Sequence, residues 1–192
     1  MLAEPIAVSM MVANALESLG VPYALRSPLA SAVHGVLHAT MDADFVADLR
    51  IDHVEALVRR LGRAFYIDEA VVRDAIHRRT SFNLIHFETM VEVDVFVAKS
   101  RPFDRAPLSR RQHHALTEEA DALACITTAE DVVLSKLEWY QMSGCVSERQ
   151  WRGVLGVLKV QGDRLDLNDL RRMAASLDVA DLLRRALHET AE

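Results

Sequence analysis

The segment DADFVADL, at residues 42–49, is typical of a buried strand with two carboxylates at its start. Residues two apart in a strand share one face, so Asp42 and Asp44 point together while Ala43 and Phe45 point into the core. The Asp-x-Asp spacing is weak evidence alone, because a solvated strand end gives the same pattern. Its meaning depends on which other side chains reach the same face of the sheet.

A second strand with an unexpected acid lies at VEVDVFV, residues 91–97. Its four valines share one face, and Asp94 lies on the opposite face. Aspartate disfavours strands, so this position needs a reason. Three carboxylates on one sheet face can hold two divalent cations about 4 Å apart, the spacing used for phosphoryl transfer, and magnesium prefers such oxygen ligands. We therefore name Asp42, Asp44 and Asp94 as candidate metal ligands and catalytic residues.

The remaining pattern predicts a mixed α/β core followed by helices. Expected strands lie at 21–25, 66–67 and 82–86, and expected helices at 6–19, 27–35, 52–61, 68–79, 128–142, 147–160, 166–176 and 178–189. Residues 101–114 are polar, basic and contain two prolines, so they are expected to form a connector with room for one helical turn. The expected domains are a core at 1–115 and a C-terminal helical region at 116–192 packed on it.

Composition narrows the class of protein. The chain has 192 residues, of which 51% are hydrophobic, enough for a sizeable core. A formal net charge of -6 argues against tight nonspecific nucleic-acid binding, although a local basic groove is compatible with it. No secretory signal and no apolar run long enough for a bilayer are visible, and two cysteines fit free thiols in a reducing cytosol. We expect a cytoplasmic protein without membrane contact.

The order of these elements resembles the nucleotidyltransferase fold of the DNA polymerase beta superfamily. More closely, four segments resemble small bacterial nucleotidyltransferases, the minimal type related to the AbiE abortive-infection toxins. They are SPLASAVHGVLHATMDADFVADL, FYIDEAVVRDAIHRRTSFNLIHFETMVEVDVFV, TTAEDVVLSKLEWY and SERQWRGVLGVLKVQGDRLDLNDLRRMA. The similarity begins near residue 13 and covers nearly the whole chain. It implies a mixed sheet flanked by helices, Mg²⁺ or Mn²⁺ as cofactor, and a nucleoside triphosphate as substrate.

The resemblance also implies residue roles. Asp42 and Asp44 match the metal-binding pair, and Asp94 matches the third carboxylate, which helps to activate the attacking hydroxyl. Lys136 matches a lysine that meets the nucleotide phosphates. Ser27 matches the small residue of the phosphate-binding loop.

The phosphate-binding loop departs from the family pattern. Relatives carry two glycines and a small residue where this chain has Arg26, Ser27 and Pro28. Glycine permits φ > 0 and a close approach of backbone to phosphate, whereas proline has no N–H to donate. A guanidinium at Arg26 could partly compensate by binding phosphate. Further departures are His38, where relatives usually show arginine, and Gly153, where aspartate is common.

Two functions stay open at this stage. The first is metal-dependent transfer of a nucleotidyl group from a nucleoside triphosphate to a hydroxyl on RNA or protein, with release of pyrophosphate. The second is a catalytically degenerate binding protein that keeps the fold; the altered loop favours it and the intact aspartates oppose it. A role in a toxin–antitoxin pair, with an antitoxin as partner, is compatible with both.

Overall fold

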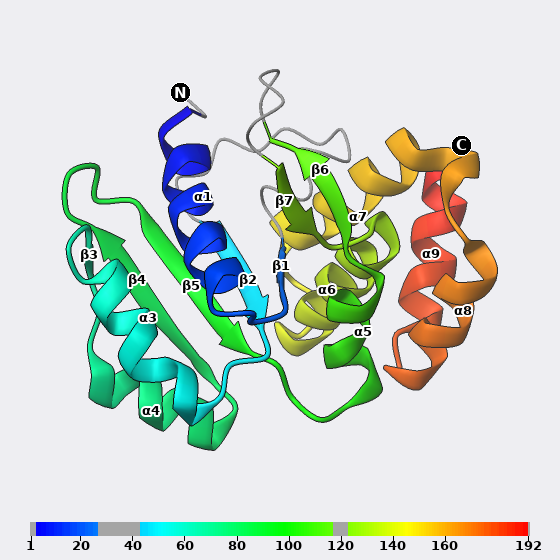
Figure 1. Ribbon diagram of the computed structural model, residues 1–192. Helices are drawn as coiled ribbons and strands as arrows, with labels where there is room; N and C mark the ends of the chain where they lie inside the picture. Colours follow the sequence, from blue (N-terminus) through cyan, green and yellow to red (C-terminus); the bar gives the residue numbers. More distant parts are fainter. Residues whose placement is uncertain (1–2, 27–42, 117–122, 192) are drawn as a thin grey trace. The chain divides into compact units, whose positions relative to one another are not determined.

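The computed structural model describes residues 3–26, 43–116 and 123–191, which form two compact units (Figure 1). Within these ranges the first unit ends at Thr127 and the second begins at Thr128. The expected helix at 27–35 lies outside the described residues.

The first unit is built on one mixed sheet, whose described strands run in the order β3-β4-β5-β2-β1-β7-β6. The strands are β1 (Tyr23–Leu25), β2 (Ala43–Ala47), β3 (Phe65–Tyr66), β4 (Ser81–His86), β5 (Glu92–Val97), β6 (Gln112–Ala115) and β7 (Leu123–Ile126). The helices are α1 (Ala3–Ser18), α3 (Val54–Leu61, after a 3-10 turn at Ile51–His53), α4 (Glu69–Arg78) and α5 (Pro102–Arg110). Strand β2 is parallel to β5, and β1 is parallel to β7; the other neighbouring pairs are antiparallel.

Helices α1, α3 and α4 cover one face of this sheet (Figure 1). Under them lie Phe45 and Ala43 of β2 and Val93 of β5, all without exposed surface. The ring of Tyr23 lies 5.7 Å from that of Phe45. The predicted alternation is confirmed along β5, and Asp44 and Asp94 lie on the other face. Along β2 the alternation ends after Asp44, because Val46, on the face of Asp44, is buried with Leu108 of α5.

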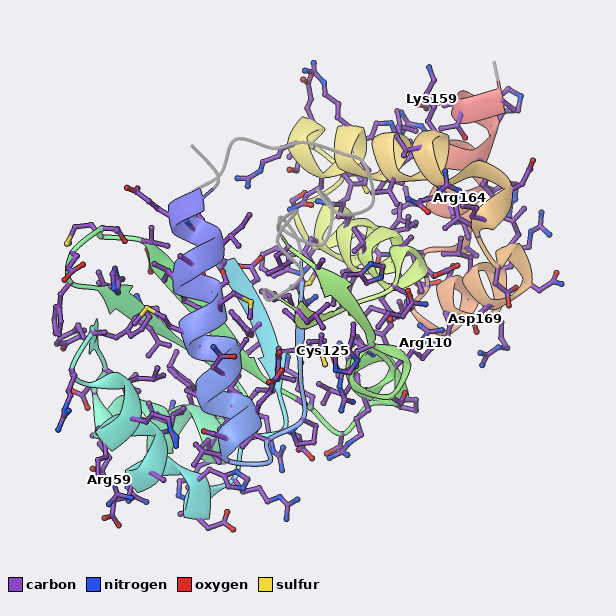
Figure 2. All side chains as sticks on the ribbon, turned by 45° about the horizontal axis from the view of Figure 1, so that its top comes forward. Arg59, Arg110, Cys125, Lys159, Arg164 and Asp169 are labelled. Atoms are coloured by element: carbon purple, nitrogen blue, oxygen red, sulfur yellow. The ribbon has the colours of Figure 1, made fainter. Side chains whose placement is uncertain are left out.

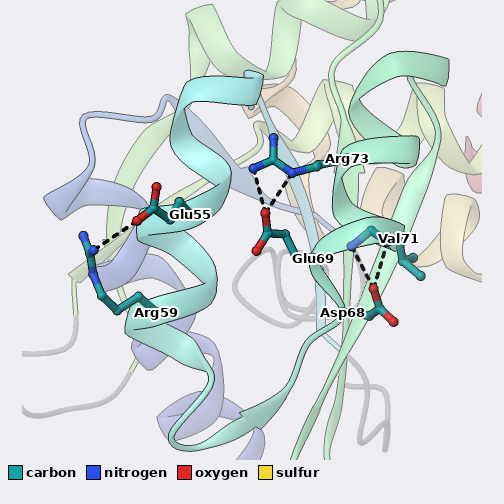
Figure 3. A network of polar contacts seen from close by, with 7 residues as sticks. Glu55, Arg59, Asp68, Glu69, Val71 and Arg73 are labelled. Atoms are coloured by element: carbon teal, nitrogen blue, oxygen red, sulfur yellow. Dashed lines mark hydrogen bonds and ion pairs between the residues drawn. The ribbon is translucent and has the colours of Figure 1, made fainter.

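Helix α4 is capped at both ends by the residues that flank it, and Figure 3 shows the N-terminal cap. The Asp68 carboxylate accepts hydrogen bonds from the backbone N–H groups of Ala70 and Val71, a cap that contributes about 1 kcal/mol. At the other end Arg79 takes the left-handed conformation, with φ 54°. These caps determine the residues at which α4 begins and ends between β3 and β4.

The second unit is helical, with α6 (Ala129–Met142), α7 (Glu148–Gln161), α8 (Leu167–Ser176) and α9 (Ala180–Ala191). All four helices were predicted. The side chains of Thr128 and Asp166 cap α6 and α8. In the core, the Tyr140 and Trp151 rings lie 5.0 Å apart, and the Trp151 indole donates to Glu189.

The prediction of a connector at 101–114 was wrong, because this segment forms α5 and then β6. Pro102 occupies the first turn of α5, where a missing N–H breaks no intrahelical bond. Strand β6 pairs with β7, and neither strand was predicted. Cys125 lies on β7 (Figure 2) and is buried, and Cys145 is exposed. Both are free thiols. No described helix has the length and hydropathy needed to cross a membrane.

Candidate functional site

Four side chains form a row across neighbouring strands on the sheet face opposite α1, α3 and α4. Asp44 of β2 and Asp94 of β5 are register partners, and Asn83 of β4 is the partner of Asp94 on its other side. The backbone N–H of Arg26 donates to the Asp44 carbonyl at 2.8 Å, which extends the β1–β2 ladder by one residue. Because cross-strand partners point to the same face, these residues form what we call the carboxylate row.

The two aspartates lie half-buried in the middle of this row. Their chain neighbours point into the helix-covered core, so strand periodicity leaves the carboxylates no other direction. The predicted faces of Asp44 and Asp94 are thus confirmed, and their register pairing adds that they are immediate neighbours. Their role as metal ligands stays a prediction.

The Arg26 side chain lies on this same face. Its guanidinium carbon is 5.4 Å from the ring centroid of Phe96, which follows Asp94 by two positions and therefore shares its face. A cation over an aromatic ring at an exposed site is stabilised by about 0.5–1 kcal/mol. The residue that replaces glycine in the altered loop thus puts a positive charge on the carboxylate-bearing face, over Phe96 of β5.

The two described carboxylates, those of Asp44 and Asp94, are suitable ligands for a hard divalent cation. Neighbouring strands lie about 4.8 Å apart, so carboxylates in register can share one ion, and Mg²⁺ prefers such oxygen ligands. Within residues 3–26, 43–116 and 123–191, no group of three or more His, Cys, Asp or Glu is arranged to hold a metal ion. The third expected ligand, Asp42, and the expected loop residue Ser27 lie outside these ranges.

Lys136 belongs to the second unit, on α6, and is only 7% exposed. Its side chain lies against the backbone of α7 at Gly153, where an added β-carbon would stand 3.0 Å from both Cδ and Nζ of the lysine. Gly153 therefore provides the space that the lysine stem occupies. The sequence shows glycine at position 153, where aspartate is common in relatives, but it does not show that this glycine makes room for Lys136. The contact between Lys136 and nucleotide phosphates stays a prediction.

A further polar cluster sits on the helix-covered face and has a structural role. The Tyr23 hydroxyl donates to Glu17 Oε1 at 2.6 Å and accepts from the backbone N–H of Cys125 at 3.3 Å. Burial, followed by the hydrogen bond to Glu17, raises the pKa of Tyr23 well above its usual value. On the neighbouring strand, His113 Nε2 lies 3.4 Å from Cys125 Sγ. Sequence spacing gave no signal for either contact.

No protein-family model and no curated protein sequence matches this chain. Among solved structures, an antigenic nucleotidyltransferase-like protein from Paracoccidioides brasiliensis is similar, with a TM-score of 0.58 and 17% identity over 97% of this chain and 93% of that one. The solution structure of the antibiotic-resistance factor ANT(2'')-Ia matches with a TM-score of 0.60 and 14% identity, over 98% of this chain and all of that one. At such identities the likeness establishes the fold, and the relation to AbiE-type toxins stays a prediction. This chain therefore has a nucleotidyltransferase-like fold.

Proposed function

We propose that this protein transfers a nucleotidyl group from a nucleoside triphosphate to a hydroxyl, with the help of Mg²⁺ or Mn²⁺. The observation that carries the proposal is the in-register pair of Asp44 and Asp94, both half-buried, on the sheet face opposite α1, α3 and α4. Aspartate is unfavourable in a central strand, and two such residues side by side add like-charge repulsion. A role in binding cations explains why the sequence keeps both.

In this proposal each candidate site residue has a task. Asp42, Asp44 and Asp94 would hold the metal, which when bound neutralises charge on the phosphates. The acceptor oxygen forms a bond to the α-phosphorus, the bond to pyrophosphate breaks, and the hydroxyl proton passes to the Asp94 carboxylate. Arg26 supplies donors to the departing phosphates in place of the loop backbone, and Ser27 and Lys136 are the other proposed phosphate contacts.

The test is label transfer. Each of the four labelled nucleoside triphosphates is incubated with the protein, Mg²⁺ or Mn²⁺, and either total RNA or total protein. The variants Asp44→Asn and Asp94→Asn should abolish transfer, whereas Asp52→Asn, an exposed carboxylate before α3, should leave it unchanged. Absence of transfer together with absence of nucleotide binding would contradict the proposal.

A degenerate nucleotide-binding protein is the second candidate, and the position of Arg26 favours it. A guanidinium on the carboxylate-bearing face is a built-in cation that can compete with a divalent metal. Replacing the loop residues by Arg26→Gly with Pro28→Ser then distinguishes the two candidates. Activity that appears only in this variant identifies the natural protein as degenerate, and an antitoxin-type partner remains compatible with either candidate.

A further inference from the structure

The sheet face that carries Asp94 continues onto β4 and β3, whereas α5 packs on it at β1 and β2. Along β4 the side chains alternate, with Asn83 exposed between the buried residues Phe82 and Leu84. On β3, Tyr66 is 56% exposed, although it is a large aromatic residue. This half of the face is therefore available to a partner in a way that the helix-covered face is not.

A second row of side chains lies beside the carboxylate row. Tyr66 is the register partner of Ile85, and Ile85 is the partner of Glu92. We call these three residues the outer row. It lies two positions along the strands from Asp94 and Asn83, a separation of about 7 Å. The Asn83 amide donates to Glu92 Oε1 at 2.7 Å and so ties the two rows together.

Charge is ordered along this face. Along β5, Glu92, Asp94 and Phe96 share this face. Glu92 lies at one end of the strand, Asp94 in the middle with Asp44 as its register partner, and the Arg26 guanidinium over Phe96 at the other end. Strands β3, β4 and β5 contain no lysine or arginine. An anionic triphosphate is therefore favoured at the Arg26 side, and the opposite side favours an acceptor with positive charge.

We propose that the acceptor is the hydroxyl side chain of an extended, basic protein segment, with a lysine or arginine two positions from the hydroxyl. This inference rests on the proposed nucleotidyl transfer. In an extended chain, side chains two positions apart project to the same side about 7 Å apart, which is the separation of the two rows. The hydroxyl then reaches Asp94 while the basic residue reaches Glu92, and apolar neighbours contact Tyr66 and Ile85.

The same arrangement of charges disfavours an RNA end as the acceptor of the nucleotidyl group. An RNA strand brings a phosphate at every nucleotide, and its binding depends on lysine and arginine side chains that neutralise those charges. Here the acceptor side presents Glu92 and Asp94 instead. The chemical step is that of the proposed function: the serine, threonine or tyrosine oxygen bonds to the α-phosphorus, pyrophosphate leaves, and the proton passes to Asp94.

The experiment uses the full chain, Mg²⁺, the four labelled nucleoside triphosphates and three acceptor pools. One pool holds peptides with a hydroxyl residue and lysine two positions away, the second holds the same peptides with glutamate in place of lysine, and the third is total RNA. The lysine peptides should be labelled about fivefold more than the glutamate peptides, the ratio expected for one exposed ion pair. The variant E92Q should remove this preference, and E92K should reverse it.

The control is Glu55→Lys, which makes the same change in net charge on the opposite side of the sheet and should keep the wild-type preference. Because Glu92 is exposed, both of its variants are expected to fold, and circular dichroism checks this. Equal labelling of the two peptide pools overturns the inference. Label on RNA alone, lost in Asp44→Asn, overturns it and leaves nucleotidyl transfer intact. An absence of label in every pool contradicts the proposed function itself.

Discussion

The guanidinium of Arg26 lies over the ring of Phe96, with 5.4 Å between its central carbon and the ring centroid, on the sheet face that carries Asp44 and Asp94. The residue that interrupts the glycine pattern thus has its positive charge on the same face as the carboxylates. A loop that binds phosphate through glycine backbone donors is replaced, at this position, by a side-chain donor fixed to the sheet. Whether that donor helps or blocks the nucleotide decides between the two candidate functions.

We expect Arg26→Ala to weaken binding of a nucleoside triphosphate by about 10- to 100-fold, because hydrogen bonds to charged groups contribute about 1.5–3 kcal/mol. Phe96→Leu should weaken binding only by a few-fold, since Phe96 orients the guanidinium without contacting phosphate. Equilibrium titration with each triphosphate measures both effects. The control is Arg59→Ala, which removes an exposed arginine on α3 (Figure 2). Unchanged or tighter binding in Arg26→Ala would support the degenerate site instead.

Divalent metal should stabilise the folded protein through Asp44 and Asp94. A ligand that binds only the native state at 100 times its dissociation constant raises the free energy of unfolding by about 2.7 kcal/mol. We therefore expect Mn²⁺ to raise the melting temperature of the wild type and to have no such effect on Asp44→Asn or Asp94→Asn. Scanning calorimetry with and without metal measures this without any need for activity. The same rise in both variants would show that the ion binds elsewhere.

Strand periodicity was sufficient to predict the faces of Asp44 and Asp94, because burial on the helix-covered side leaves a two-residue repeat that can be counted. Helical periodicity was likewise sufficient to predict the four helices of the second unit. Local pattern could not give the register of β2 against β5, since the strands are far apart in the chain and their pairing depends on tertiary packing. The immediate pairing of the two aspartates is therefore a structural finding.

Other features of the fold have weaker signals in the sequence. Helix α5 was missed because Pro107 lies inside it, a residue that usually ends or kinks a helix. Strand β6 (Gln112–Ala115) carries two adjacent histidines and shows no apolar alternation, so nothing marked it as an edge strand. The direction of Arg26 depends on Phe96, a residue 70 positions away in the chain. Such contacts follow from the fold and not from local propensity.

The contact between Gly153 and Lys136 predicts a coupling that a double-mutant cycle can measure. Alanine is favoured over glycine in a helix by about 1 kcal/mol. In the wild type this gain should be offset, because the new β-carbon would stand 3.0 Å from the lysine side chain. In a Lys136→Ala background the gain should appear in full, which gives a coupling of about 1 kcal/mol. Urea unfolding of the four proteins measures it, and identical effects of Gly153→Ala in both backgrounds would contradict the contact.

The buried hydroxyl of Tyr23 predicts a loss of stability at alkaline pH. The pKa of Tyr23 is raised in the folded state by burial and by its hydrogen bond to Glu17, whereas in the unfolded chain it is about 10. The contribution of Tyr23 to the free energy of unfolding is therefore fully present below pH 10. Above pH 10 it is lost by about 1.4 kcal/mol per pH unit, because the tyrosine ionises in the unfolded chain.

Tyr23→Phe should remove that part of the pH dependence. It should also lower the free energy of unfolding at neutral pH by about 1–2 kcal/mol, because the buried N–H of Cys125 loses an acceptor. The control is Tyr66→Phe, which changes an exposed tyrosine. The free energy of unfolding of this variant should follow the same pH dependence as that of the wild type. Urea unfolding between pH 8 and pH 11 compares the three proteins. Parallel curves for wild type and Tyr23→Phe would show that the hydroxyl is not held neutral by the fold.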